Sequence, residues 1–215
     1  MNTDKLRREY RTQHGHLLET NVSIDPFAQF QSWFADAVDA KLDLPDAMTL
    51  ATATPEGVPS ARMVVLRGFD AEGFCFYTDY GSQKGRELAL NRHAALVFYW
   101  RELDRQVRST GTVQEMRAEE SDTYFRSRPV SSQLAVWAER QSRQIEGREH
   151  LTERYKQMER RYEQEDTIPR PPDWGGYRLV PNLFEFWQGC PNRLHDRLCY
   201  TLQPDGTWTL NRLSP

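Results

Sequence analysis

The first regular pattern of apolar positions lies between residues 25 and 38. Asp25-Pro26 is a typical helix start, because aspartate can cap free backbone N–H groups and proline fits the first helical position. Apolar residues then recur at three- and four-residue spacing, at Phe27, Phe30, Phe34, Ala37 and Val38. The pattern predicts a helix with one apolar face.

From Met48 the pattern changes to short runs of strand-forming residues separated by tight turns. The runs are MTLATAT, SARMVVLRGF, FCFYTD, AALVFYW and RQVRSTGTV, with a helix expected at about residues 82–91 between the third and the fourth. Strands resume near the C-terminus with YRLV, LFEFWQG, RLHDRLCYTL and TWTLNRL. Consecutive strands joined by turns predict an antiparallel meander that closes into a barrel, because closure removes exposed edges.

Helical patterns interrupt these strands between about residues 118 and 166. Leu151, Tyr155, Met158 and Tyr162 mark one face of a segment with interleaved acids and bases, which predicts a solvated helix packed along one stripe. The stretch TIPRPPDWGG then reads as an extended connector. The predicted fold class is mainly β with inserted helices (α+β), in a single domain of residues 1–215.

Composition narrows the class of protein. With 27% charged residues, 12% aromatic residues and a net charge of -3, the chain resembles an ordinary globular protein and not a nucleic-acid binder. No apolar run approaches the ~20 residues that span a bilayer, and the charged start MNTDKLRREYRTQ is unlike a signal peptide. We therefore expect a cytoplasmic protein with no membrane or nucleic-acid partner.

Metal binding and several common catalytic sites are not indicated. Cys75, Cys190 and Cys199 have no paired spacing and suit reduced thiols, and only His14 and His16 are close together among the histidines. The sequence has no GxGxxG after a strand, no GxxxxGK[ST] loop and no GxSxG elbow. We therefore expect no metal, no Rossmann nicotinamide site and no serine hydrolase.

Basic and aromatic residues gather near the ends of the predicted strands. Arg193, His195 and Arg197 are two residues apart, so in a regular strand they share one face, where an anion or electron-rich ring would relieve their repulsion. The alternative for these three residues is a solvated outer face of the barrel.

A second group is formed by Tyr124, Arg128 and Ser132. Tyr124 and Arg128 are four apart on a helix that Pro129 is expected to end, and Ser131 or Ser132 could cap the next helix. Free N–H groups beside a hydroxyl and an arginine make a plausible phosphate cradle. A structural cap beside an exposed arginine is equally consistent with the pattern.

Two further positions suggest anion binding. Arg62 and Arg67 lie five apart, on opposite faces of a regular strand, so either a bulge intervenes or they serve different groups. Lys84, in the first turn of a helix, opposes the helix dipole and would neutralise an anion bound there. The pattern supports a site for a phosphorylated, aromatic ligand.

The chain resembles the pyridoxine/pyridoxamine 5′-phosphate oxidases along nearly its whole length. The matching motifs, in the same order, are RREY, RMVVLR, FYTDYGSQKGREL, RQV, YFRSRP, RQS, WGGYR and EFWQG…RLHDR. The resemblance implies an FMN-binding split β-barrel, a homodimer with flavin sites at the subunit interface, and oxidation of pyridoxine or pyridoxamine 5′-phosphate to pyridoxal 5′-phosphate. Oxygen would be the acceptor, H2O2 a product, and ammonia a second product from the amine.

The resemblance also implies residue roles. FMN contacts fall on Arg62, Met63, Val64, Val65, Leu66, Arg67, Tyr77, Thr78, Gln83, Lys84, Gln106, Gln141, Ser142, Trp187 and Arg197. Substrate contacts fall on Arg7, Arg8, Glu9, Tyr10, Arg67, Tyr124, Arg128, Ser132, Arg193, Leu194 and His195. Within this set Arg193 and His195 are the implied catalytic residues, residues 1–24 are the implied lid, and hydride passes from substrate C4′ to flavin N5.

The sequence departs from the family pattern at a few positions. Arg67 stands where lysine is expected, Gln83 where an arginine often assists with the FMN phosphate, and Ala135-Val136 where a Gly-Ala pair is expected. Two alternatives follow from these departures. One is a related flavin oxidase of another ring system, of the phenazine-biosynthesis type; the other is a barrel that binds FMN or pyridoxal phosphate without turnover.

Overall fold

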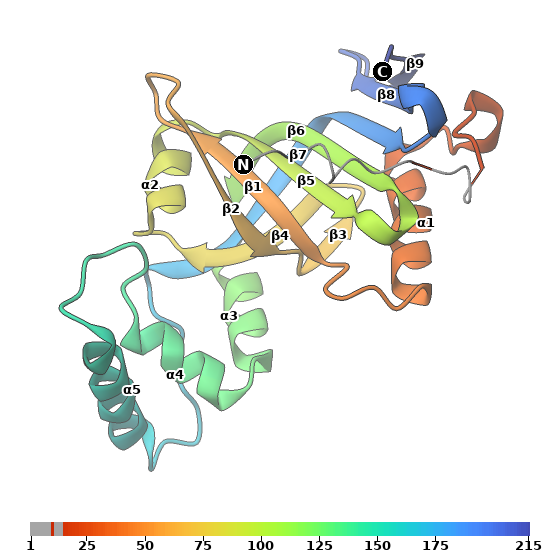
Figure 1. Cartoon of the computed structure of the whole chain (residues 1–215). Coiled ribbons are helices and arrows are strands. Elements are labelled where there is room, and N and C mark those ends of the chain that lie inside the picture. Colours follow the sequence, from red (N-terminus) through yellow and green to blue (C-terminus); the bar gives the residue numbers. More distant parts are fainter. Residues whose placement is uncertain (1–9, 11–14) are drawn as a thin grey trace, which may run out of the picture.

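The computed structural model describes Tyr10 and residues 15–215 (Figure 1). Its helices are α1 (Pro26–Asp39), α2 (Gln83–Leu90), α3 (Ala118–Ser127), α4 (Val130–Ala138) and α5 (Arg148–Tyr162). Its strands are β1 (Ala47–Ala53), β2 (Pro59–Val65), β3 (Gly68–Asp70), β4 (Gly73–Asp79), β5 (His93–Trp100), β6 (Arg105–Glu115), β7 (Trp174–Gln188), β8 (Asp196–Leu202) and β9 (Trp208–Arg212).

These strands form one curled antiparallel sheet. The order is β2-β1-β5-β6-β7-β4-β3, and β8 pairs with β7 and β9. Strand β7 organises the sheet: along one edge it pairs with β6, and along the other its first half pairs with β4 and its second half with β8. The sheet is therefore not the simple meander that the sequence predicted, because β7 inserts between β6 and β4.

The core lies inside the curl and is rich in aromatic rings. Asp25 caps α1 by accepting a hydrogen bond from Phe27 N at 3.0 Å, as predicted. This helix buries Phe30 against Phe74 and Phe98, at ring-centroid distances of 4.8 and 5.0 Å. The predicted apolar face is correct except at Val38, which is 49% exposed, while Trp33 is buried instead.

The long strand β7 replaces two predicted strands and the end of the predicted connector. A bulge opposite Thr110 and Gly111 leaves Asn182 unpaired next to Pro181, so the strand accommodates the proline, which lacks an N–H group. Gly111 allows this close approach, because a Cβ atom there would lie 2.0 Å from the Val180 carbonyl oxygen. The predicted run SARMVVLRGF is in turn divided into β2 and β3, with Leu66 and Arg67 between them.

The helices gather at the two ends of the sheet. Figure 1 shows α3, α4 and α5 together at one end, while α1, β8 and β9 lie toward the other. Helix α5 has no buried residue, and Tyr155, Met158 and Tyr162 pack on a small cluster around Phe125 and Trp174, as predicted. Leu151, the first residue of the predicted stripe, is not part of this cluster. No helix in residues 15–215 is long and apolar enough to cross a membrane.

Candidate active site

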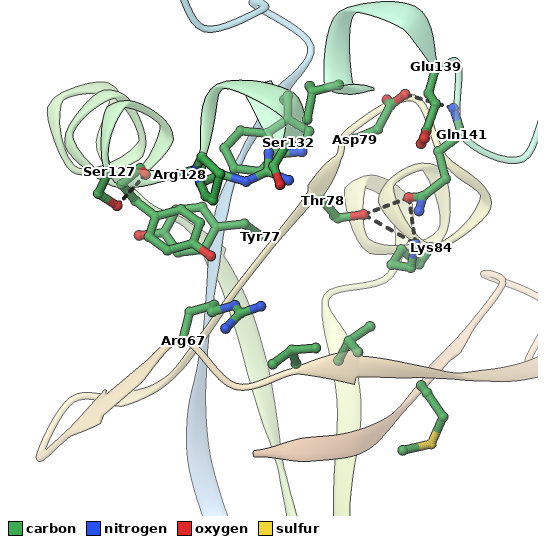
Figure 2. Close-up of a pocket in the computed structure, with 17 residues that line it drawn as sticks. Arg67, Tyr77, Thr78, Asp79, Lys84, Ser127, Arg128, Ser132, Glu139 and Gln141 are labelled. Carbon is green, nitrogen blue, oxygen red and sulfur yellow. Dashed lines mark hydrogen bonds between the residues drawn. The ribbon is translucent and has the colours of Figure 1, made fainter. Parts of the chain in front are cut away.

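A pocket of about 500 Å³ opens where the ends of β2 and β4 meet α3 and α4. Eleven residues assigned to cofactor or substrate line it: Met63, Val64, Val65, Arg67, Tyr77, Thr78, Lys84, Tyr124, Arg128, Ser132 and Gln141. Figure 2 shows Arg67 and Arg128 on one side of the pocket and Lys84, Thr78 and Gln141 on the other. A cavity of this size accommodates a small ring compound with an attached phosphate.

Stacked aromatic rings form one wall of the pocket. Tyr77 stacks on Tyr124 with 3.8 Å between ring centroids and on Trp174 with 5.5 Å. The guanidinium of Arg128 lies over the Trp174 ring, 4.9 Å from its centroid. The stack holds Arg128 by a cation–π contact and leaves its donors for another partner.

Arg128 is the most informative residue of the pocket. Its Nη1 atom is buried and has no hydrogen-bond partner in the described structure. Burial lowers the pKa of Arg128, and the positive charge of nearby Arg67 lowers it further. Since a buried unpaired donor is costly and two neighbouring cations repel, an anion bound here would satisfy both groups. The site therefore suits a phosphate group.

Arg128 and Ser132 reach the pocket by a local geometry that differs from the prediction. Helix α3 ends at Ser127, so Arg128 is the extended residue after the helix and not part of the Tyr124 face. Pro129 occupies the N-cap position of α4 without a side-chain cap, and Ser131 and Ser132 lie inside the first turn. The predicted serine cap is therefore wrong, while Ser132 still lines the pocket.

Lys84 forms the opposite, cationic side. Its Nζ atom donates to Thr78 Oγ1 at 3.2 Å and to Gln141 Oε1 at 2.8 Å. The side chain is almost fully buried, and burial together with the positive charge of Arg62 lowers the pKa of Lys84 to about 8. Both hydrogen-bond acceptors are neutral, and the nearby carboxylates of Asp79 and Glu87 offset the lowering of the pKa only in part.

Arg62 faces a different network, outside the residues that line the pocket. Its guanidinium contacts Glu87 at 3.3 Å, and Glu87 also accepts hydrogen bonds from Thr52, Ser60 and Gln83. Burial opposes ionisation of Glu87, but these hydrogen bonds and the Arg62 charge hold its pKa at about 2. This network anchors α2 to β1 and β2, beneath the helix start that carries Lys84.

This network predicts a contribution to acid stability. A carboxyl group with its pKa lowered from 4.5 to about 2 stabilises the fold by roughly 3 kcal/mol above pH 4.5, and that contribution is lost as the pH falls toward 2. Glu87→Gln should therefore lower the free energy of unfolding by about 2–3 kcal/mol at pH 7. Urea unfolding of both proteins at pH 7 and pH 3 checks this: the difference should shrink at pH 3, and parallel pH curves would contradict it.

Another set of predicted site residues lies at the opposite end of β7. Trp187 packs against His195 at 4.8 Å between ring centroids, and Tyr10 contacts both rings at 5.5 and 5.1 Å. His195 Nδ1 accepts a hydrogen bond from Cys190 N at 3.1 Å, so in the neutral ring Nε2 carries the proton. Burial and the nearby Arg193 charge lower the pKa of His195, which favours this neutral form.

The single-strand arrangement predicted for Arg193, His195 and Arg197 is wrong. Pro191–Arg193 forms a 3-10 turn, Asn192 and Arg193 have positive φ of 56° and 62°, and β8 begins only at Asp196. Arg197 is in the strand, where Nε donates to Glu185 Oε1 at 2.8 Å. The three side chains therefore do not share one face of a strand. A turn places Arg193 and His195, and the buried carboxylate of Glu185 holds Arg197.

The two groups are far apart within one chain. Trp174 lines the pocket and Trp187 belongs to the second group, and both are in the continuous strand β7. A strand rises by about 3.3 Å per residue, so this separation reaches up to about 40 Å. Gln106 pairs with Trp187 in the sheet, which places it with the second group.

The remaining assigned residues lie around these groups. Gln83 turns its side chain to Glu87, Ser142 accepts a hydrogen bond from Gln83 N at 3.2 Å, and Leu66 is buried in the core. Leu194 is 69% exposed beside His195. Arg7, Arg8 and Glu9 lie outside the described residues, as does most of the predicted lid.

Several lining residues were not anticipated. They are Asp79, Ser127, Pro129, Val136, Glu139 and Trp174. Asp79 positions the pocket by accepting hydrogen bonds from Gly81 N at 2.6 Å and Gln141 N at 3.1 Å. Trp174 belongs to the WGGYR motif, which could have identified it as a site residue. It was missed because Trp174 also belongs to the predicted extended connector TIPRPPDWGG, outside the predicted strands.

Comparison with known proteins places this architecture in a family. A family model described as pyridoxamine 5′-phosphate oxidase matches residues 34–162, and one described as pyridoxine 5′-phosphate oxidase C-terminal dimerisation region matches residues 174–215. The chain is 54% identical to the pyridoxine/pyridoxamine 5′-phosphate oxidase of Cyanothece sp., over 98% of this chain and 97% of the relative. It is 55% identical to that of Acaryochloris marina, over 98% and 94%.

Solved structures agree with the fold. PhzG from Burkholderia lata in complex with tetrahydrophenazine-1-carboxylic acid superposes with a TM-score of 0.86 at 32% identity, covering 93% of this chain and 98% of that chain. A pyridoxamine 5′-phosphate oxidase-related, FMN binding protein of Nostoc punctiforme shares the fold with a TM-score of 0.69 at 17% identity, over 90% and 100%. The expected split-barrel fold is confirmed. This chain belongs to the pyridoxamine 5′-phosphate oxidase family.

Proposed function

We propose that this protein is an FMN-dependent oxidase that converts pyridoxine 5′-phosphate and pyridoxamine 5′-phosphate to pyridoxal 5′-phosphate with O2 as acceptor. The observation that carries the proposal is the buried, unpaired Nη1 of Arg128 in a pocket lined by cations and aromatic rings. The names of relatives above 50% identity support the same substrate class. H2O2 and, from the amine, ammonia would be the other products.

The residues present suit FMN. Lys84, with Thr78 and Gln141, offers a positive charge and hydrogen-bonding groups for the cofactor phosphate. Strand β2 is at an end of the sheet path, so among residues 15–215 alternate backbone groups along residues 62–65 have no strand partner on one side and can face a flavin ring. When bound, FMN supplies the two-electron acceptor for a hydride from substrate C4′.

The protein would contribute binding and orientation. Arg128, Tyr124 and Ser132 would hold the substrate phosphate, and the Tyr77–Tyr124–Trp174 stack would provide an apolar wall. Arg193 and His195 would close over the substrate ring, with His195 donating through Nε2–H because its Nδ1 is already an acceptor. We do not assign His195 as the base, since no carboxylate of residues 15–215 forms a hydrogen bond with its ring.

The separation of the two residue groups supports a composite site across a homodimer. The pocket of one subunit would be completed by Gln106, Trp187, Arg193, His195 and Arg197 of a second copy, because one chain holds them up to about 40 Å apart. The match of residues 174–215 to a dimerisation region supports the same arrangement. This is the isologous geometry in which two equal sites form per dimer.

Mixing two impaired variants, assayed at a substrate concentration well below the wild-type KM, tests the composite site. Arg128→Ala damages one group and Arg193→Ala the other, so a heterodimer contains one intact and one doubly damaged site. Refolding the two variants together in equal amounts should recover about a quarter of wild-type activity, because half the dimers are mixed and half their sites are intact. Recovery no greater than the sum of the separate variants would contradict the composite site.

A direct assay tests the reaction. The purified protein should show flavin absorbance and should form pyridoxal 5′-phosphate from either phosphorylated vitamer in air, with O2 consumed. Bound flavin without turnover would contradict the oxidase proposal, and failure to bind FMN would contradict the whole assignment.

The similarity to PhzG supports a second candidate, an oxidase of reduced phenazine carboxylic acids. Its identity to this chain is 32%, against 54% for the Cyanothece sp. relative. The two functions differ in the anion: a phosphate dianion in one and a ring carboxylate in the other. Comparing kcat/KM for pyridoxine 5′-phosphate and tetrahydrophenazine-1-carboxylic acid distinguishes them.

Lys84 makes the proposed FMN binding dependent on pH. Its pKa of about 8 in the free protein should rise when the cofactor phosphate binds, so binding takes up a proton. FMN affinity should be constant below pH 8 and fall above it, measured by fluorescence quenching between pH 7 and 9.5. Lys84→Met should weaken binding about tenfold at pH 7 and remove this dependence. Arg86→Met, on the exposed side of α2, is the control and should retain both affinity and pH dependence.

A further inference from the structure

Three side chains with different donor atoms converge beside the turn that carries Arg193. They are His16, Cys190 and Asp196, from the N-terminal segment, the loop after β7 and the start of β8. His16 Nδ1 lies 3.1 Å from Asp196 Oδ2, Cys190 Sγ lies 3.3 Å from the same oxygen, and Sγ and Nδ1 are 3.8 Å apart. The three atoms therefore lie at the corners of a small triangle, whose sides are these three distances.

We propose that this triangle is a binding site for a zinc ion or a similar borderline divalent cation. A tetrahedral zinc ion has Zn–S of about 2.3 Å and Zn–N and Zn–O of about 2.0 Å, which separates its ligand atoms by about 3.3–3.5 Å. The observed sides bracket these values. Sulfur, imidazole nitrogen and carboxylate oxygen are ligands that zinc accepts together.

Burial leaves one side of the site open. Cys190 is 2% exposed and the Asp196 side chain 14% exposed, whereas the His16 side chain is 59% exposed. His16 is therefore the ligand on the solvent side, and a water molecule would fill the fourth position of a bound ion. Three protein ligands with one open position are the arrangement of zinc sites that retain an exchangeable ligand.

The surrounding charges fit a divalent ion. A Cys190 thiolate and the Asp196 carboxylate neutralise its two charges. Arg212 holds Asp196 Oδ1 at 2.7 Å, and its own charge is balanced by Glu19 at 2.8 Å. Leu17 N donates to Asp196 Oδ2 at 3.1 Å, so the carboxylate is oriented before any ion arrives.

The site is preorganised by hydrogen bonds in the metal-free protein. The Cys190 thiol and the His16 imidazole both point to Asp196 Oδ2. Binding replaces these bonds: the thiol releases one proton to solvent as sulfur bonds to the ion, and the imidazole proton resides on Nε2 while Nδ1 binds. Zinc affinity should therefore rise with pH.

Metal binding at this position would connect two parts of the proposed site. It ties the segment at residue 16, which follows Tyr10, to the loop after β7. Cys190 also donates its backbone N–H to His195 Nδ1 at 3.1 Å. An ion on the Cys190 sulfur would therefore restrain the loop that carries Arg193 and His195.

Cobalt titration of the full-length flavin-loaded protein tests the site without using turnover. One equivalent of Co2+ should bind and produce the absorption of a tetrahedral cobalt–thiolate centre, and zinc should displace it. Cys190→Ser should abolish the sulfur-to-cobalt band. His16→Ala, a change at an exposed position, should weaken cobalt binding about tenfold or more while flavin absorbance stays unchanged.

His93→Ala and Cys199→Ala are the matched controls, an exposed histidine and a buried cysteine away from the triangle. Both should keep the wild-type band and affinity. The proposal is overturned if no stoichiometric cobalt binding occurs, if the band persists in Cys190→Ser, or if His93→Ala weakens binding as much as His16→Ala.

Discussion

Arg128→Ala should lower kcat/KM for pyridoxine 5′-phosphate about a hundredfold or more, mainly through KM. The guanidinium has a buried nitrogen without a partner and lies over Trp174, so it is held in position for an anion. Removing one partner of a buried charged hydrogen-bonded pair costs about 2–5 kcal/mol, which corresponds to this loss. Steady-state kinetics with oxygen uptake measure it.

The substrate phosphate provides a sharper test of the same residue. If Arg128 binds it, the preference of the wild-type enzyme for the phosphorylated over the unphosphorylated vitamer should largely disappear in Arg128→Ala. Arg126→Ala, an exposed arginine at the end of α3, is the control and should behave as wild type. An unchanged preference in Arg128→Ala would show that the phosphate binds elsewhere.

Arg193→Ala and His195→Ala should each reduce kcat/KM about a hundredfold with FMN retained. Both residues are placed by the turn after β7 and would orient the substrate ring. A substrate ring that is no longer held in the productive position is expected to react about a hundredfold more slowly. Asn211→Ala, at an exposed position of β9 that has no assigned role in the site, is the control and should have little effect. Kinetics and flavin content of the purified variants separate the two properties.

Arg197→Ala should affect both turnover and flavin content, because Arg197 is assigned to the cofactor. It should also reduce stability, since Glu185 is 3% exposed and, among the residues that the structure describes, would retain only Arg108 as its ion-pair partner. Small and equal effects of all three substitutions would contradict the separate roles.

The sequence predicted elements whose signals are local. The Asp25 cap and the apolar spacing after it identified α1, and Ser82 caps α2 by accepting from Gly85 N at 3.3 Å. Short alternating runs identified most strands. The predicted family and fold are correct because the specific motifs extend along the chain and the family models match most of it.

Errors arose where local signals compete. Pro191-Asn192 is a turn signal, because proline fixes φ and asparagine tolerates positive φ, but the strand-like run RLHDRLCYTL predicts a strand that begins at Arg193. The two separate strands predicted at YRLV and LFEFWQG are one strand, because a bulge accommodates Pro181 within β7. Thr78 Oγ1 donates a hydrogen bond to Gln141 Oε1, 63 residues further along the chain, and such contacts follow from topology and not from local pattern.

The length of β7 has a genetic consequence under the proposed dimer. One uninterrupted strand carries Trp174 at one end and Trp187 at the other, so a single polypeptide would present the first part of one site and the second part of another. Alleles that damage opposite ends should complement each other in one cell, whereas alleles at the same end should not. Enzyme activity in diploid or merodiploid strains would then map each variant to one end of the strand without a structure of the variant.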